Sequence, residues 1–580
     1  MKFNGQAGLA YQLPRLENTG SFELPLTSND LKIWLAELPI LNINQLAYQL
    51  PKYVQDLNRI KHSDKDRFDM LEQLRPIVAY LYETLTKRFR GANLNLSIES
   101  QEVKWLLNVL ISEMAIAYQR LLFNLAATEP SYLNQRKYSV LAQRAIYYLG
   151  EKIYLSYLIS TAVTERTWLE FNATYAYTRR LELNTKKVKD KIAFFGANKG
   201  TIDTLYNRSL VLSLVSPYSL RSAELEQIYY GLLPWFSCIK LVAIVKPHNE
   251  FHLIDLKKDK GPEFKQLSAI DDDKYSIDLT GLLKKLTVWL ETKKAPKSAA
   301  YKGMSEKLLT QIIANLEGQD HRGDERLDSP GEQVEVVVGL QEIDLFLGHI
   351  DALMNQQDDS SLAEINDDDQ QQDKQQAVIW DDSLDGHWDE LHYYSLQESV
   401  DKQQLKPSNE HHYNYEVRSH EFKINNESER GVCLSCSSLN DTGLYIGELM
   451  FIRGFDPEIW TLGIIRWMTV KNKQLEVGLY LLSAHVDQVI VSQNGLAGDM
   501  TINALWMGES ENGNTILLPR ADFKTGDELL LDHQGELIEV KLGDVIWHSE
   551  GFSQFCMDEQ ELQVEKWQST QDFNIPAWAK

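Results

Sequence analysis

Residues 426–431 read Asn-Glu-Ser-Glu-Arg-Gly and lie between two short apolar segments in the C-terminal third of the chain. Phe422 and Ile424 alternate with polar residues before this stretch, and apolar residues alternate again after it, which predicts two strands joined by a corner. Short Asn and Ser side chains hydrogen-bond nearby backbone groups, and Gly allows a positive φ or a close approach. On residue types alone this is a polar turn. It would bring together the side chains of Asn426 and Ser428 and the backbone of Gly431.

Three further strands are expected after this corner, at 444–453, 460–467 and 475–482. Short strands at this spacing are typical of a small antiparallel barrel. Taken together, the succession resembles the PilZ domain, the bacterial receptor module for cyclic di-GMP, over roughly residues 413–492. The resemblance rests on the Asn-x-Ser-x-x-Gly corner, a strand similar to the Gly-x-Val-Arg-Trp type, and a Val-Gly-Leu strand.

The resemblance implies a ligand site. In PilZ domains an Arg-x-x-x-Arg pair just ahead of the first barrel strand binds the guanines and phosphates of cyclic di-GMP, and an Arg pair stands here before the Val-rich segment 333–340. The planar fork of Arg pairs with phosphate or with guanine O6 and N7, and it can stack on a base. The implied ligand-binding residues are Arg322, Arg326, Asn426, Ser428 and Gly431.

The chain departs from the family in the 100 positions that separate the second Arg from the corner, where PilZ domains usually have a short stretch. Residues 356–390 hold twelve Asp or Glu against one Lys, a net charge of −11 that is nearly half of the chain's −24. Such a composition cannot bury enough apolar surface to offset chain entropy, which predicts disorder. We interpret the segment as an insertion inside a barrel whose first strand precedes it. Loop closure costs only about 0.6 kcal/mol per doubling of length, so such an insertion is tolerable.

The N-terminal part shows helical periodicity. Apolar residues recur at helical spacing over 71–85, 105–121 and 140–158, and Pro76 predicts a kink or the start of a new helix after Arg75. No repeat of about 34 or about 40 residues is convincing, so tetratricopeptide-like packing and a plain bundle both remain open. Several tyrosines on these helices fit an aromatic core or, less commonly, a partner-binding groove; they include Tyr147, Tyr148, Tyr154 and Tyr157.

The expected fold is multidomain α + β, with an N-terminal α-helical array, a small α/β unit, and a C-terminal PilZ-like antiparallel β-barrel with a β extension. The α/β unit should contain a β-hairpin formed by 240–246 and 251–254, followed by helices over 278–291 and 304–316. The expected boundaries are an extended tail at 1–28, the helical array at 29–235, the α/β unit at 236–320, the Arg pair and first barrel strand at 321–344, the acidic disordered insertion at 345–412, the PilZ-like barrel at 413–500, the β extension at 501–557 and a polar tail at 558–580.

Composition narrows the class of protein. A chain of 580 residues with 43% hydrophobic and 24% charged residues is typical of soluble globular proteins, and its net charge of −24 argues against nucleic acid as the main partner. The start lacks the apolar core of a signal peptide, and the longest apolar run, 106–123, is broken by two charges, so we expect a cytoplasmic protein without a membrane span. Cys433 and Cys436 would point to opposite faces of a strand, so we expect no metal site.

Catalytic patterns are missing from the sequence. Residues 196–201 do not meet the phosphate-loop spacing, and no Gly-x-Ser-x-Gly or His-Glu-x-x-His pattern occurs. The first hypothesis is a non-catalytic cyclic di-GMP effector without a cofactor, in which the helical domain engages an unidentified protein partner. The alternative is a degenerate PilZ-like scaffold or adaptor that does not bind nucleotide.

Overall fold

The structure is a computed structural model, and it describes most of the chain outside the acidic segment and the C-terminal tail. The described residues are 8–17, 25, 27–40, 42–87, 98–127, 134–194, 199–244, 250–266, 273–294, 303–318, 327–328, 331–348, 419–428, 430–437, 444–453, 460–471, 474–493, 501–510, 513–519, 523–533, 535–549 and 551–559.

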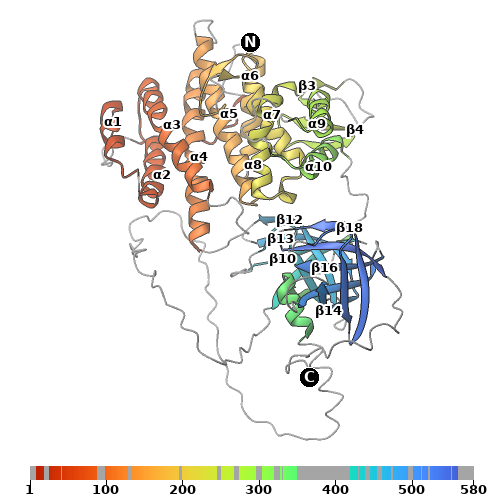
Figure 1. The fold of residues 1–580 in the computed structure, drawn as a ribbon. Helices are drawn as coiled ribbons and strands as arrows, with labels where there is room; N and C mark the ends of the chain where they lie inside the picture. Colours follow the sequence, from red (N-terminus) through yellow and green to blue (C-terminus); the bar gives the residue numbers. More distant parts are fainter. Residues whose placement is uncertain are drawn as a thin grey trace, which may run out of the picture.

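Helices form the first half of the molecule, drawn in red to yellow in Figure 1. Short polar residues begin several of them: Thr27, Asn42 and Ser63 each accept a hydrogen bond from a backbone N–H of the first turn. The helices are α1 (Ser28–Glu37), α2 (Ile43–Arg59), α3 (Asp64–Thr86), α4 (Ile98–Ala126), α5 (Gln135–Leu158), α6 (Thr167–Arg180), α7 (Ile202–Leu214) and α8 (Ser222–Gly231).

Two features of this domain settle questions that the sequence left open. Helix α3 runs through Pro76, so no new helix starts after Arg75. Leu74 and Val78, on either side of the proline, are fully buried, and their packing offsets the lost backbone hydrogen bond. Helix α5 lies at the centre of the domain and packs against α4, α6, α7 and α8. The four tyrosines named above all lie on α5 and are at most 5% exposed, so they belong to an aromatic core and form no open groove.

The α/β unit shares the hydrophobic core of the helices. Its sheet has the order β3-β6-β4-β5, from β3 (Lys240–Ala243), β4 (Glu250–Asp255), β5 (Glu263–Gln266) and β6 (Lys274–Asp278). The expected hairpin of β3 with β4 is therefore wrong, because β6 lies between them and pairs with both. Helices α9 (Thr280–Thr292) and α10 (Glu306–Glu317) follow, and α10 begins at Ser305, which caps it.

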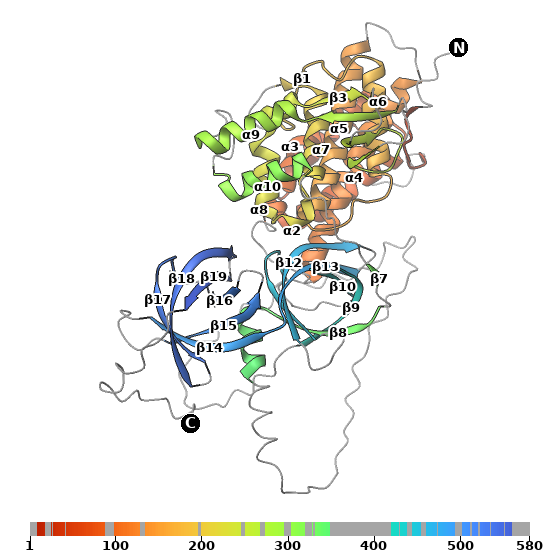
Figure 2. The same cartoon turned by 90° about the vertical axis from the view of Figure 1, so that its right-hand side faces the viewer.

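Six strands close into a first barrel in the second half of the chain (Figure 2). They are β8 (Gln333–Val338), β9 (Ser419–Ser428), β10 (Gly431–Cys436), β11 (Leu449–Arg453), β12 (Trp460–Lys471) and β13 (Gln474–Ser483). The ring runs β10-β13-β12-β11-β8-β9 and is closed by pairing of β9 with β10. Strand β8 thus lies between β9 and β11, although 80 residues separate its end from the start of β9.

What the sequence predicted as a β extension is a second closed barrel beside the first, as Figure 2 shows. Its order is β14-β15-β16-β19-β18-β17, closed by pairing of β14 with β17. The strands are β14 (Val486–Gln493), β15 (Thr501–Ser510), β16 (Gly513–Pro519), β17 (Glu528–His533), β18 (Glu536–His548) and β19 (Phe552–Glu559). Strand β14 was expected in the first barrel, so this second barrel begins earlier than the predicted extension.

A helical segment over 340–348 connects the two barrels. Leu340 and Ile343 enter a core that also contains side chains of both barrels. The Asp344 carboxylate accepts hydrogen bonds from Gln488 Nε2 at 2.6 Å and Asn503 Nδ2 at 2.8 Å, both on the second barrel. The barrels are therefore packed against each other through a common core.

Candidate ligand-binding site

The Asn-x-Ser-x-x-Gly corner is a tight hairpin between β9 and β10. Ser428 is the last residue of β9 and pairs with Gly431, the first residue of β10. The Ser428 hydroxyl donates to the Gly431 carbonyl at 3.4 Å, which keeps the turn closed. A Cβ atom at Gly431 would lie 2.9 Å from the Leu479 carbonyl oxygen, closer than such contacts occur. The glycine is therefore needed so that β13 can approach the corner.

Polar side chains continue along β9 behind the corner. Asn426 is half-buried and pairs with Cys433, where a β-bulge shifts the register of β10. The neighbouring Asn425 accepts a hydrogen bond from the Ser435 hydroxyl at 2.8 Å, so its side chain is committed to the sheet. Asn426 and Ser428 stand two positions apart on one strand and therefore share a face of it.

A short strand that the sequence analysis missed connects the corner to the arginine segment. Strand β7 (Leu327–Asp328) pairs with β9, with Leu327 opposite Glu427 and Asp328 opposite Asn426. Arg322 and Arg326 lie outside the described residues, but Arg326 directly precedes Leu327 in the chain. Leu327, the first residue of β7, is therefore the described residue nearest in sequence to the arginine pair. A two-residue strand has no periodic pattern by which the sequence could have revealed it.

Strands β12 and β13 hold the back of this region in place. A Cβ atom at Gly478 would lie 1.9 Å from the indole Nε1 of Trp467, so the tryptophan side chain occupies the space above the glycine. Gly478 pairs with Cys433 on its other side. The Trp467 side chain thus packs on β13 at Gly478. Strand β13 is also the strand whose Leu479 carbonyl lies close to Gly431.

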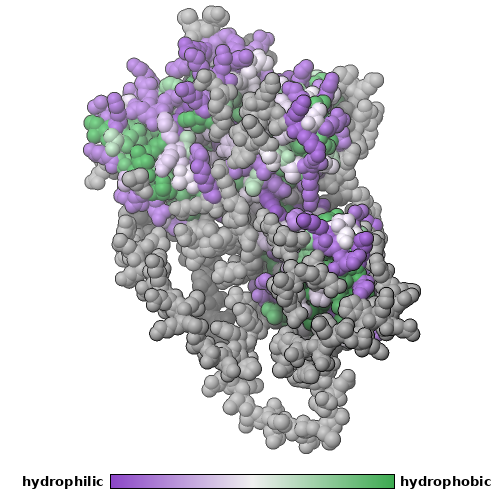
Figure 3. All heavy atoms as spheres, viewed as in Figure 1, coloured by the Kyte–Doolittle hydropathy of each residue, from purple (hydrophilic) through white to green (hydrophobic). Residues whose placement is uncertain are grey.

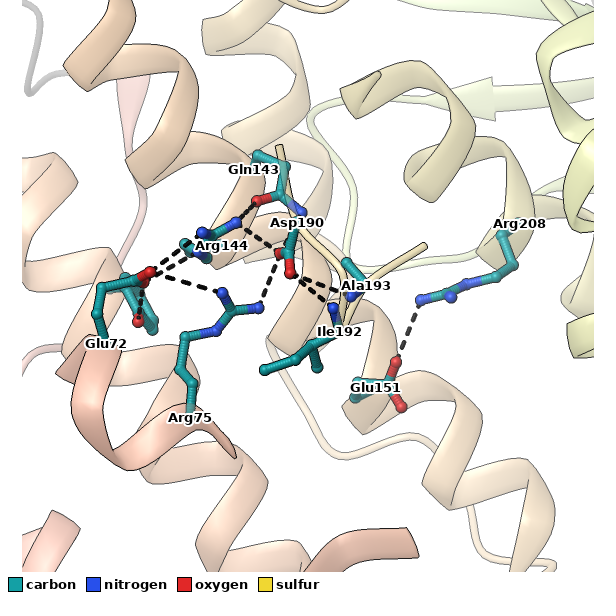
Figure 4. Close-up of polar contacts among 10 residues, drawn as sticks. Glu72, Arg75, Gln143, Arg144, Glu151, Asp190, Ile192, Ala193 and Arg208 are labelled. Atoms are coloured by element: carbon teal, nitrogen blue, oxygen red, sulfur yellow. Dashed lines mark hydrogen bonds and ion pairs between the residues drawn. The ribbon is translucent and has the colours of Figure 1, made fainter. Parts of the chain in front are cut away.

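A second concentration of polar side chains lies inside the helical domain (Figure 4). Asp190 accepts hydrogen bonds from Arg75 Nη2 at 2.7 Å, Arg144 Nη1 at 2.5 Å and Gln143 Nε2 at 3.0 Å. Arg144 also reaches Glu72, with its Nε 3.0 Å from a Glu72 carboxylate oxygen. The side chains of Arg75, Arg144 and Asp190 are 4%, 7% and 1% exposed, so these three charged groups are not open to a ligand.

The charges of that cluster stabilise one another. Burial by itself would raise the pKa of Asp190, but the guanidinium groups of Arg75 and Arg144 outweigh it and hold the pKa below its usual value. The pKa of Glu72 is lowered as well, because hydrogen bonds and charge from Arg144 outweigh its desolvation. Both carboxylates are therefore ionised and paired, which is a structural role.

The described residues give no support for a metal site and only weak support for a membrane-spanning helix. No group of three or more His, Cys, Asp or Glu there could hold a metal ion, and both cysteines of the Cys-x-x-Cys pair are buried in β10. One helix of the described chain, Gln101–Ala126 in α4, is long and apolar enough to cross a membrane, but 72% of its most apolar window is buried inside the domain. Core helices of folded domains have the same properties, so this is weak evidence for a span.

Comparison with known proteins finds two family matches, which together cover residues 29–245 and 251–487. Residues 29–245 match the family "Cyclic-di-GMP receptor FimW, N-terminal domain", and residues 251–487 match "Cyclic-di-GMP receptor FimW, middle PilZ domain". The chain is also similar to the cyclic-di-GMP receptor FimW of Pseudomonas aeruginosa, with 21% identity over 549 residues that cover 91% of this chain and 90% of the relative. No solved structure matches the chain. The matched middle-domain region spans β8 as well as β9 to β13, on both sides of the acidic segment.

Proposed function

We propose that this chain is a non-catalytic, cytoplasmic receptor for cyclic di-GMP, because it carries a region that matches a PilZ domain behind one that matches the FimW N-terminal domain. In this proposal Arg322 and Arg326 bind the guanines and phosphates, Asn426 and Ser428 make polar contacts, and Gly431 admits the ligand close to the backbone. These groups bind and orient a nucleotide but include no nucleophile with an adjacent base. The nucleotide is therefore expected to be released unchanged, and product formation on incubation would contradict the proposal.

The pairing of β7 with β9 is the observation that carries the proposal. Asp328 stands opposite Asn426, so the chain segment that follows Arg326 lies along the strand that bears the polar corner. In sequence these two halves of the site are 100 positions apart. The pairing of residues 327–328 with β9 supports a site to which both segments contribute.

We also propose that the helical domain passes the state of the barrel to a protein partner. The two are joined by backbone hydrogen bonds: the Ala162 N–H donates to the Val470 carbonyl at 3.0 Å, and the Val470 N–H donates to the Ser160 carbonyl at 2.7 Å. Arg221 Nε, at the start of α8, donates to the Ile446 carbonyl at 3.4 Å. These contacts support a path from strand β12 to the segment after α5, and from the segment before β11 to the start of α8.

Replacement of Arg322 or Arg326 by Ala is expected to weaken cyclic di-GMP binding by at least about tenfold, or about 1.4 kcal/mol, because charge-assisted two-pronged hydrogen bonds are lost. Isothermal titration of each variant measures this loss. Arg453→Ala is the matched control, because Arg453 is an exposed arginine far from the corner. Its side chain pairs with Glu335, which lies opposite Glu421 on β9. Glu421 is seven residues from Ser428, and at about 3.3 Å per residue the two are about 23 Å apart along the strand.

Equal affinities for the two site variants and the wild type would remove Arg322 and Arg326 from the site. The alternative function, a scaffold that has kept the PilZ fold without its ligand, predicts a different result. A folded wild-type chain that shows no saturable binding would favour that scaffold.

A further inference from the structure

A basic surface stands out on this acidic chain. Residues 179–199 contain seven Lys or Arg and two acidic residues, whereas the whole chain has a net charge of −24. One of the two acids, Asp190, is buried and paired with Arg75 and Arg144, so it does not neutralise the surface. The exposed charge of this stretch is therefore almost entirely positive.

The lysines of this stretch project from a loop that the interior holds in place. Over residues 186–191 the four lysines are exposed, while Val188 and Asp190 are buried. Asp190 accepts hydrogen bonds from the backbone N–H groups of Ile192 at 3.0 Å and Ala193 at 3.2 Å in addition to its arginine partners. Figure 4 shows this anchor, with Asp190 reaching toward the side chains of Arg75 and Arg144. The backbone from which the lysines project is thus anchored, so binding a partner need not order the loop itself.

The start of helix α5 extends the same surface. Lys186 Nζ donates to Gln135 Oε1 at 2.6 Å, which joins the loop to the first turn of α5. That turn contains exposed Arg136 and Lys137 and no acidic residue, and the side chain of the N-cap Asn134 makes no capping hydrogen bond. The N-terminus of a helix carries a partial positive charge, which Arg136 and Lys137 add to. An anion bound here would interact favourably with the helix terminus and with these two side chains. The basic loop surface consists of Arg136, Lys137, Lys186, Lys187, Lys189 and Lys191.

The lysines at the centre of the surface have no acidic partner within the described part of the chain: no ion pair there involves Lys187, Lys189 or Lys191. The surface also lies away from the barrels, since β1 (Val188–Lys189) is at the opposite end of the helical domain in Figure 2. Hydrophilic side chains cover that end of the domain in Figure 3. A partner could therefore bind here while the barrels remain docked.

We propose that the basic loop surface is the docking site for an acidic peptide segment of a protein partner. This rests on the proposed role of the helical domain in engaging a protein, and it names the surface and the chemistry of that partner. Lysine predominates on this loop, whereas planar recognition of phosphate favours Arg. None of the exposed large hydrophobic or aromatic side chains of the described chain lies on the loop, where base stacking or membrane insertion would need them. The net charge of −24 also repels a long polyanion such as nucleic acid.

Binding of a fluorescein-labelled peptide of alternating Asp and Glu, about ten residues long, tests this proposal on the intact chain by fluorescence anisotropy. The affinity of the wild type should fall as the ionic strength rises from about 0.01 to about 0.15 M, because exposed charges are screened over a shorter distance. Joint substitution of Lys187→Glu, Lys189→Glu and Lys191→Glu is expected to reduce the affinity by at least about tenfold.

A control with the same change in net charge is Lys32→Glu, Lys65→Glu and Lys284→Glu, three exposed lysines on α1, α3 and α9. It should bind the peptide within about twofold of the wild type. No peptide binding by the wild type, or an equal loss in both variants, would overturn the proposal. Tighter and equally lysine-dependent binding of duplex DNA or of phosphatidylglycerol vesicles would overturn it too, because the partner would then be of another class.

Cyclic di-GMP titration of the same loop variant separates this inference from the receptor function. The substituted lysines lie on the helical domain and touch neither the corner nor β7, so nucleotide affinity should match the wild type. A chain that binds peptide but no nucleotide would overturn the receptor function and leave the docking surface intact.

Discussion

A fragment from Asp401 to Glu559 is expected not to form the first barrel, because it lacks β7, β8 and the helical segment 340–348. Strand β8 pairs on both sides, with β9 and with β11, so its loss leaves two unpaired strand edges. It also removes buried Val336 and Val337, and the segment after it removes buried Leu340 and Ile343. At about 1.5–3 kcal/mol for each fully buried side chain, this approaches the whole stability of a typical domain, about 5–15 kcal/mol.

The matched fragment runs from Gln319 to Glu559 with residues 356–405 replaced by a short Gly/Ser linker. The retained residues 349–355 and 406–418 can together span about 70 Å when extended, in addition to the linker. Hydrogen exchange followed by mass spectrometry should show protected strands β9 to β13 in this fragment and fast exchange of the same strands in the shorter one. Protection of those strands in the fragment that begins at Asp401 would show that the barrel is complete without β8.

Asp190→Ala is expected to destabilise the helical domain by about 3–5 kcal/mol, because it leaves Arg75 and Arg144 buried without their shared carboxylate. Urea unfolding of the intact chain, followed by the signal of the helices, measures this change. Glu83→Ala is the control: Glu83 pairs with Lys87 at 2.9 Å, but both side chains are at least half exposed, so the loss should stay below about 1 kcal/mol. Similar destabilisation by the two variants would mean that the buried cluster contributes no more than a surface pair.

The same cluster predicts how stability depends on pH. The folded-state pKa values of Asp190 and Glu72 lie below their ordinary values of 3.8 and 4.5. Their contribution is therefore fully present above those ordinary values and is lost as the pH falls through the depressed folded-state values. Urea midpoints of the helical domain should drop with acidification below about pH 4.5, and they should drop less in Asp190→Ala, which lacks one of the two groups.

Local patterns in the sequence predicted the local elements of this fold. The corner at 426–431 is found from turn residues between alternating strands, and its hairpin, closed by the Ser428 hydroxyl, depends on those same residues. Helices α4 and α5 follow from apolar spacing. The prediction of a PilZ-like barrel, which used the order of these elements, is confirmed by the family match to residues 251–487.

Long-range pairing was harder to predict, because alternation says which face of a strand is buried but not which strand lies beside it. Strands β3 and β4 follow one another in the chain, yet β6 lies between them in the sheet. Strand β14 continues the alternation of β13 but pairs with β15 and β17 in the second barrel. Strand β7 is too short to carry any pattern, and it is the element that joins the arginine segment to the corner.

The central claim, that this chain is a cyclic di-GMP receptor, is tested most directly by isothermal titration of the intact wild-type chain with cyclic di-GMP, with cyclic di-AMP as the comparison ligand. The proposal predicts saturable binding of cyclic di-GMP and much weaker binding of cyclic di-AMP, because adenine lacks the O6 acceptor that the arginine fork pairs with in guanine. A folded chain that gives no saturable heat with cyclic di-GMP, or that binds both nucleotides equally, would contradict it.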